Sequence, residues 1–148
     1  MFTREDLVTG LDRLAVAPAP PLEMVEFGHQ DFTSPCSEQL IEVCSGLKAD
    51  FDSPLLFWVK ALQAQDWAGR EARFTAYTLL GLYKPMAATE FAAFVADYSG
   101  SLVRPLPPVL LALNGFQTGL RMSADWNDVA AVAELDETYV AYFWSTTA

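Results

Sequence analysis

The sequence of 148 residues contains few of the residue types that build metal sites and disulfide frameworks. It has two cysteines, Cys36 and Cys44, and a single histidine, His29. Structural zinc sites use four Cys or His ligands, and small secreted domains are held together by several disulfides. The counts exclude both classes, and the spaced oxygen ligands of a calcium loop are also missing. We therefore expect no metal and no cofactor.

Basic residues and long apolar runs are scarce as well. Nine Lys and Arg stand against 19 Asp and Glu, which gives a formal net charge of −10. Nucleic acids and anionic lipids are bound by net basic surfaces, so neither is an expected partner. No apolar run approaches the roughly 20 residues that span a bilayer. Glu5 and Asp6 stand where a signal peptide would be basic. The sequence therefore predicts a cytoplasmic protein.

Apolar residues, in contrast, are abundant. They make up 52% of the chain, and aromatic residues make up 13%. A disordered acidic chain has far fewer of both, so this composition indicates a packed core. Because 148 residues is a usual length for one domain, we expect a single globular domain over 1–148.

Helix-start signals recur along the chain. Thr3 with Asp6 forms a capping-box pattern, and the proline-rich run 18–21 ends the helix that follows. Ser34-Pro35 and Ser53-Pro54 each place a capping serine before a proline at the first helical position. Segment 70–83 is interpreted as helix, with strand as the alternative, and 22–33 as irregular. The further helices are predicted over 35–47, 55–65, 90–98 and 109–113.

The carboxy-terminal part has a different pattern. Residues 129–135 form an apolar run of strand length, Asp136 and Glu137 supply a turn, and 138–146 are rich in β-branched and aromatic residues. The pattern predicts a β-hairpin that is apolar on both faces and therefore covered on both. The predicted fold class is α+β: a mainly α-helical single domain with a carboxy-terminal β-hairpin packed on the helices.

His29 and the cysteines are the residues from which a nucleophilic site would be built. Asp31 lies close enough in sequence to orient the His29 ring. Cys36 falls in the first turn of a predicted helix, where the helix dipole lowers the pKa of a thiol, and Cys44 is the other possible thiolate. Cys36 and Cys44 would lie about 12 Å apart on one helix, too far for a disulfide. Glycine-rich phosphate loops and Gly-x-Ser-x-Gly elbows are absent. A small hydrolase using His29 with Cys36 is kept as an alternative, but no catalytic residue is assigned.

The acidic residues are concentrated towards the two ends of the chain. Residues 1–53 carry a net charge of −7 and residues 122–148 a net charge of −5, whereas the middle carries +2. Acids interleaved with aromatic residues suit docking on a basic protein, because charge guides the encounter and buried rings supply affinity. Candidate aromatic anchors are Trp67, Trp126, Tyr139 and Tyr142. The predicted partner-binding residues are Asp125, Trp126, Asp128, Asp136, Glu137 and Tyr139.

The last 22 residues, NDVAAVAELDETYVAYFWSTTA, resemble the ending of small bacterial immunity proteins. Some of those proteins end in an apolar strand, an acidic turn and an aromatic strand that closes on small hydroxyl residues. The resemblance implies an acidic, cytoplasmic, non-enzymatic protein that occludes the active site of a cognate bacterial toxin. The main alternative is a structural, assembly or chaperone-like protein that forms a homo-oligomer through an apolar edge of the hairpin.

Overall fold

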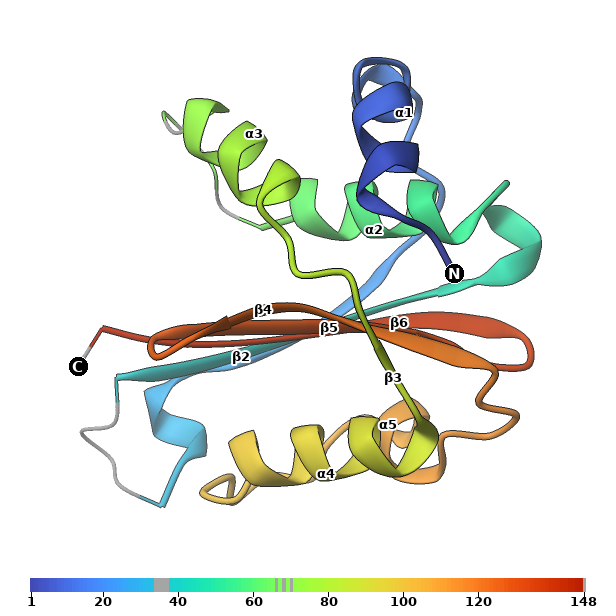
Figure 1. The fold of residues 1–148 in the computed structure, drawn as a ribbon. Coiled ribbons are helices and arrows are strands. Elements are labelled where there is room, and N and C mark those ends of the chain that lie inside the picture. The colour runs from blue at the N-terminus through green and yellow to red at the C-terminus, as the bar shows by residue number, and fades with distance from the viewer. Residues whose placement is uncertain (34–37, 66, 68, 70, 148) are drawn as a thin grey trace.

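The computed structural model describes residues 1–33, 38–65, 67, 69 and 71–147. They form three layers, with one antiparallel sheet between two layers of helices (Figure 1). The strands are β1 (Glu23–Phe27), β2 (Gln39–Leu47), β3 (Lys84–Met86), β4 (Thr118–Asp125), β5 (Asp128–Glu134) and β6 (Thr138–Thr146). The helices are α1 (Arg4–Val16), α2 (Pro54–Gln63), α3 (Glu71–Leu79), α4 (Ala88–Tyr98) and α5 (Pro108–Ala112), with 3-10 turns η1 (His29–Asp31) and η2 (Lys48–Asp50).

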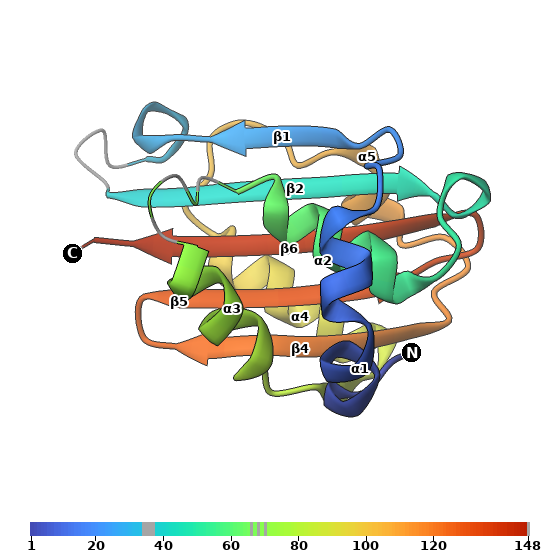
Figure 2. The same cartoon turned by 90° about the horizontal axis from the view of Figure 1, so that it is seen from above.

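The strand order in the sheet is β1-β2-β6-β5-β4-β3, and every neighbouring pair is antiparallel. The chain lays down β1 and β2, then crosses the sheet through α2 and α3 to reach β3 at the opposite edge (Figure 2). From there α4 and α5 lead to the meander β4-β5-β6, whose last strand pairs with β2. The predicted carboxy-terminal hairpin is confirmed as β5 and β6, and it lies at the centre of the sheet.

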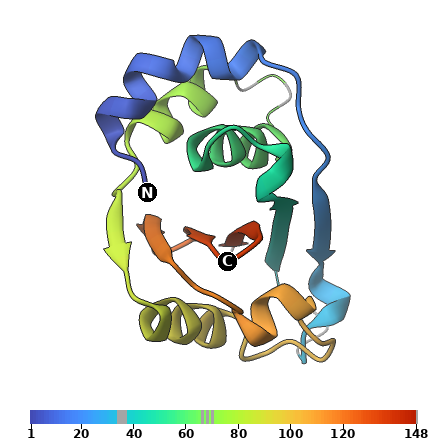
Figure 3. The same cartoon turned by 90° about the vertical axis from the view of Figure 1, so that its right-hand side faces the viewer.

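Both faces of the sheet are covered, by α1, α2 and α3 on one side and by α4 and α5 on the other (Figure 3). The alternation along β6 serves both layers. Ala141 and Phe143 face the first core, where Trp58 of α2 stacks on Phe143. Val140 and Tyr142 face the second core, where Phe94 of α4 meets the ring of Tyr142 edge to face. Two-sided burial of the hairpin, predicted from its two apolar faces, is confirmed.

The local helix signals are confirmed in most cases. The Thr3 hydroxyl accepts a hydrogen bond from the Asp6 amide, and the Asp6 carboxylate accepts one from the Thr3 amide. At the start of α2, the Ser53 hydroxyl accepts from the Leu56 amide, with Pro54 at the first helical position. The segment 70–83 was interpreted as helix, with strand as the alternative. Residues 71–79 form helix α3, so the helix interpretation is confirmed for them.

The predicted mainly α-helical fold is wrong, because a six-stranded sheet organises the molecule. Residues 39–47, expected in a helix, form β2, and residues 23–27, expected to be irregular, form β1. Ile41 and Val43 of β2 face one core and Cys44 faces the other. A strand that is buried on both faces is apolar nearly throughout, and the periodicity of a short apolar run does not separate it from a helix. The helix start at Ser34-Pro35 lies outside the described residues.

None of the helices in the described part of the chain combines the length and apolarity needed to cross a membrane.

Candidate functional site

A cleft of about 600 Å³ opens at the end of the sheet where β4 turns into β5. Its walls come from β2, the end of α2, α3, the turn at 125–128 and the end of β6. In Figure 2, α3 lies over this end of the β4–β5 hairpin. The cleft therefore exists because α2 and α3 cover the sheet only partly where the strands end. We call this end of the sheet the cleft end.

Aromatic rings with fixed positions form much of the cleft wall. The indole nitrogen of Trp67 donates a hydrogen bond to the carbonyl oxygen of Leu62 (2.6 Å), and its ring lies 5.6 Å from that of Tyr77. On the sheet side, Phe143 is held by stacking on Trp58 at 5.6 Å. Because these rings are tied to neighbouring elements, the cleft has a preformed apolar lining.

Carboxylates enter the cleft from two elements. Asp125 and Asp128 face each other across the β4–β5 turn, and Glu42 lies on β2. The Tyr77 hydroxyl donates to Oδ1 of Asp128 (3.1 Å), which links α3 to the turn. Arg73, exposed on α3, is the basic residue among the described lining residues.

Asp128 has an unfavourable environment for a charged group. Partial burial raises the pKa of its carboxyl above the usual value, and the nearby charge of Asp125 raises it further. The hydrogen bond from Tyr77 acts in the opposite direction and lowers the Asp128 pKa, but it does not cancel the two other effects. Burial likewise raises the pKa of the Tyr77 hydroxyl, so this group stays protonated and remains a donor. The cleft thus holds a partly desolvated carboxylate next to a second one.

Trp126 stands at the tip of the β4–β5 turn, beside the cleft. Its side chain is 75% exposed, unlike that of Trp58, which is fully buried. Large aromatic side chains are normally covered in folded proteins, so an indole in this position is a candidate contact residue.

The six predicted partner-binding residues do not lie together. One group, at the turn between β4 and β5, comprises Asp125, Trp126 and Asp128. The other group, at the turn between β5 and β6, comprises Asp136, Glu137 and Tyr139. The seven residues of β5 separate the two turns, which at about 3.3 Å per residue is roughly 20 Å. The two groups therefore cannot form a single small patch.

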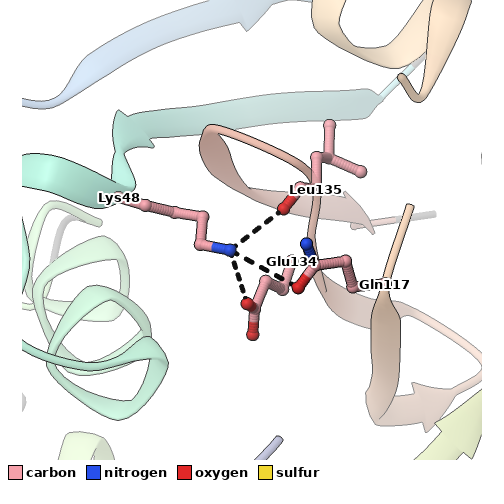
Figure 4. A network of polar contacts seen from close by, with 4 residues as sticks. All are labelled: Lys48, Gln117, Glu134 and Leu135. Carbon is pink, nitrogen blue, oxygen red and sulfur yellow. Dashed lines mark hydrogen bonds and ion pairs between the residues drawn. The ribbon is translucent and has the colours of Figure 1, made fainter. Parts of the chain in front are cut away.

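The turn between β5 and β6 is closed by Lys48, and we call it the closed end. The Lys48 ammonium group contacts the Glu134 carboxylate (2.6 Å), the Leu135 carbonyl oxygen (3.3 Å) and the Gln117 side-chain oxygen (3.5 Å) (Figure 4). Tyr139, next to this turn, is only 5% exposed. Acidic charge here is already neutralised in part, and the aromatic ring is already used by the core.

The residues proposed for a nucleophilic site are not assembled among the described residues. His29 is exposed in η1, and the Asp31 carboxylate accepts hydrogen bonds from the Gly28 amide and from Arg104. Cys44 is fully buried on β2, and burial raises the pKa of its thiol to about 12. A thiol with this pKa stays protonated at neutral pH and is a poor nucleophile. Cys36 lies outside the described residues.

No cluster of three or more His, Cys, Asp or Glu side chains in the described part of the chain is arranged to hold a metal ion. Comparison with known protein families, with curated proteins and with solved structures gave no match.

Most lining residues of the cleft, Glu42, Arg73 and Tyr77 among them, were not predicted as site residues. Glu42 and Tyr77 carried no signal, because nothing in a single sequence shows that β2 and α3 meet the turn at 125–128. Arg73 lies in the segment 70–83, which was interpreted as helix without a functional role. Trp67 was predicted as an aromatic anchor, and it lines the cleft. Tyr142 was also predicted as an anchor, but it is fully buried and hydrogen-bonded to Ser99.

Proposed function

We propose that this protein is an acidic cytoplasmic binding protein that neutralises a basic protein partner, in the manner of an immunity protein occluding the active site of a cognate bacterial toxin. The observation that carries the proposal is the exposed indole of Trp126, which lies in the β4–β5 turn next to Asp125, a lining residue of the cleft. No catalytic role is assigned to any residue.

The arrangement at the cleft end has the features of a protein-binding surface. A central aromatic side chain that becomes buried on binding supplies a large part of the affinity in many complexes. Acidic residues around it attract a basic partner and align the encounter. Trp126 is the aromatic side chain and Asp125 is an acidic residue beside it. The adjacent cleft is a concave surface of a size that suits a protruding side chain.

The closed end is a weaker candidate for the same role. Glu134 is paired with Lys48, and Tyr139 is inside the core. A basic partner that binds there must either displace Lys48 from Glu134 or bind without the Glu134 carboxylate. A homo-oligomer through an edge of the hairpin is also disfavoured, because β5 pairs with β4 and β6 pairs with β2, which leaves neither strand with a free edge.

Growth protection tests the function directly. The chain is co-expressed in bacteria with each toxin-like reading frame that a search of the neighbouring genes finds, and growth is measured with and without toxin induction. We expect the unaltered chain to restore growth and Trp126→Ala to lose protection. Leu111→Ala is the matched control, because Leu111 is an exposed apolar residue of α5 on the opposite layer. Full protection by Trp126→Ala, or no protection by the unaltered chain, would contradict the proposal.

The charge contribution is tested by the salt dependence of binding to the same toxin domain. Affinity is expected to fall as salt rises, and Asp125→Asn is expected to weaken binding and flatten this dependence. Asp136→Asn, an equivalent change at the closed end, is expected to alter neither. An affinity that is the same at low and high salt would remove the electrostatic part of the proposal.

A further inference from the structure

We propose that the cleft receives the guanidinium group of an arginine side chain from the partner. This inference rests on the proposed function and names what the partner inserts beside Trp126. It is carried by the cavity itself, its charge and its aromatic walls, each of which favours a planar cation.

The volume of the cleft suits a side chain rather than a fold element. About 600 Å³ holds a long side chain with its first water molecules, whereas an α-helix with its side chains is about 10 Å across. A partner loop that covers Trp126 is at the right place to send one side chain into the cleft.

The charge of the lining selects a cation. Asp125 and Asp128 bring two carboxylates to the lining, and among the described lining residues Arg73, exposed on α3, is the basic one. Tyr77 occupies Oδ1 of Asp128, and Oδ2 has no hydrogen-bond donor within the described ranges. This oxygen belongs to a half-buried carboxylate and is available to a donor that enters from outside.

The aromatic walls favour guanidinium over ammonium. A guanidinium group stacks on aromatic rings and donates two parallel hydrogen bonds to a carboxylate, whereas an ammonium group does neither as well. Trp67, Tyr77 and Phe143 supply the rings, and Asp128, hydrogen-bonded to Tyr77, supplies the carboxylate. An arginine in this position would compensate the unfavourable burial of Asp128.

The test is a titration of the full chain with N-acetyl-arginine amide, followed by the NMR signals of the indole N–H groups. N-acetyl-citrulline amide, which has the same shape without the charge, and N-acetyl-lysine amide are the ligand controls. We expect saturable binding of the arginine compound in the millimolar range, shifts centred on Trp67, and at least fivefold weaker binding of both controls.

The protein variants locate the site. Asp128→Asn is expected to weaken arginine binding at least fivefold, whereas Asp136→Asn, at the closed end, leaves it unchanged. Asp125→Asn, which alters an exposed carboxylate, serves as the second variant if Asp128→Asn does not fold. Equal binding of the citrulline or lysine compound, or unaltered binding by the folded cleft variants, would overturn the inference.

The outcome is separable from that of the growth assay. Arginine binding without neutralisation of a toxin would keep the pocket and remove the proposed function. Neutralisation without arginine binding would keep the function and remove the pocket.

Discussion

The two ends of the central hairpin carry similar residue types in opposite situations. At the closed end, the Glu134 carboxylate is 2.6 Å from the Lys48 ammonium group, and the Tyr139 ring packs between core residues. At the cleft end, Asp128 is partly buried beside another carboxylate, and the Trp126 ring is exposed.

The difference indicates which end is shaped by stability and which by binding. Pairing a carboxylate with an ammonium group and burying a ring both favour the folded state. Within the described residues, the partly buried Asp128 carboxylate has no basic partner and the Trp126 indole is exposed to water, and neither arrangement favours the folded state. Exposed apolar side chains and partly buried carboxylates without a counter-charge are typical of surfaces where a binding partner covers the one and neutralises the other. The predictions below test this contrast.

The largest effect is expected from removing one aromatic side chain at each end. Tyr139→Ala should lower the free energy of unfolding by about 3–5 kcal/mol, the usual cost of truncating a buried aromatic residue. Trp126→Ala should change it by less than about 0.5 kcal/mol, because the side chain is exposed. Urea denaturation followed by circular dichroism measures both. Comparable losses in the two variants would show that the ring of Trp126 also supports the fold.

A smaller effect is expected at Gly115, in the loop that packs against the closed end. Its φ of +66° is unfavourable for other residues, and an added Cβ would overlap the Cβ of Asp136. Gly115→Ala should therefore lower the free energy of unfolding by about 1–3 kcal/mol. Gly28→Ala is the control, since nothing lies near its Cβ position and its φ is −91°. An unaltered stability of Gly115→Ala would mean that the closed end tolerates movement.

The Lys48 contacts make a pH-dependent contribution. The hydrogen bond to Glu134 raises the Lys48 pKa above its usual value of 10.5, so folding favours the protonated form. This stabilisation is present below the usual pKa and is lost as the pH rises through the raised value. Lys48→Met should therefore melt at a lower temperature than the unaltered chain at pH 8, and the difference should shrink as the pH rises through the raised Lys48 pKa. A difference that stays constant with pH would assign the effect to packing of the side chain.

The smallest effect, opposite in sign, is expected at Asp128. Its raised pKa means that folding favours the protonated form, so its contribution is most favourable below its usual pKa and is lost as the pH rises through the raised value. Asp128→Asn should raise the melting temperature by up to about 2 °C at pH 7 and make no difference near pH 3. The asparagine oxygen still accepts the Tyr77 hydrogen bond. A lower melting temperature at pH 7 would show that the charged carboxylate stabilises this end.

The elements with local signals were predictable from the sequence. A capping hydroxyl such as that of Thr3 or Ser53 acts within three residues, so its pattern is visible in a single chain. The hairpin β5–β6 was predictable for the same reason, since its two strands are joined by a short turn.

The sheet was not predictable from such signals, because its remaining pairings join distant segments. β2 pairs with β6, and its burial on both faces hides the alternation that marks a strand. β1 is a short edge strand with exposed glutamates, and its composition is close to that of a loop. β4 contains a bulge between Arg121 and Ser123, which interrupts the alternation along the strand.

The candidate site was predictable in part. Trp126 between acidic residues was visible in the sequence, as an aromatic in a turn that lacked an obvious core role. The cleft depends on Glu42, Trp67 and Tyr77 approaching the turn at 125–128, which requires the tertiary fold. The sequence prediction placed residues of both acidic turns in one partner-binding set, and Lys48 distinguishes the two turns only in three dimensions.

The central place of β6 has a consequence for how the chain acquires its structure. β6 joins β1–β2 on one side to β5–β4–β3 on the other, and Gln39 pairs with Thr146 across most of the sequence. Because synthesis runs from the amino terminus, the edge of β2 that pairs with β6 stays unpaired until residues 138–146 have left the ribosome. Contacts between such distant segments slow folding, and open apolar edges favour aggregation. Synthesis that stalls before residue 138 should therefore yield aggregates rather than a smaller folded domain.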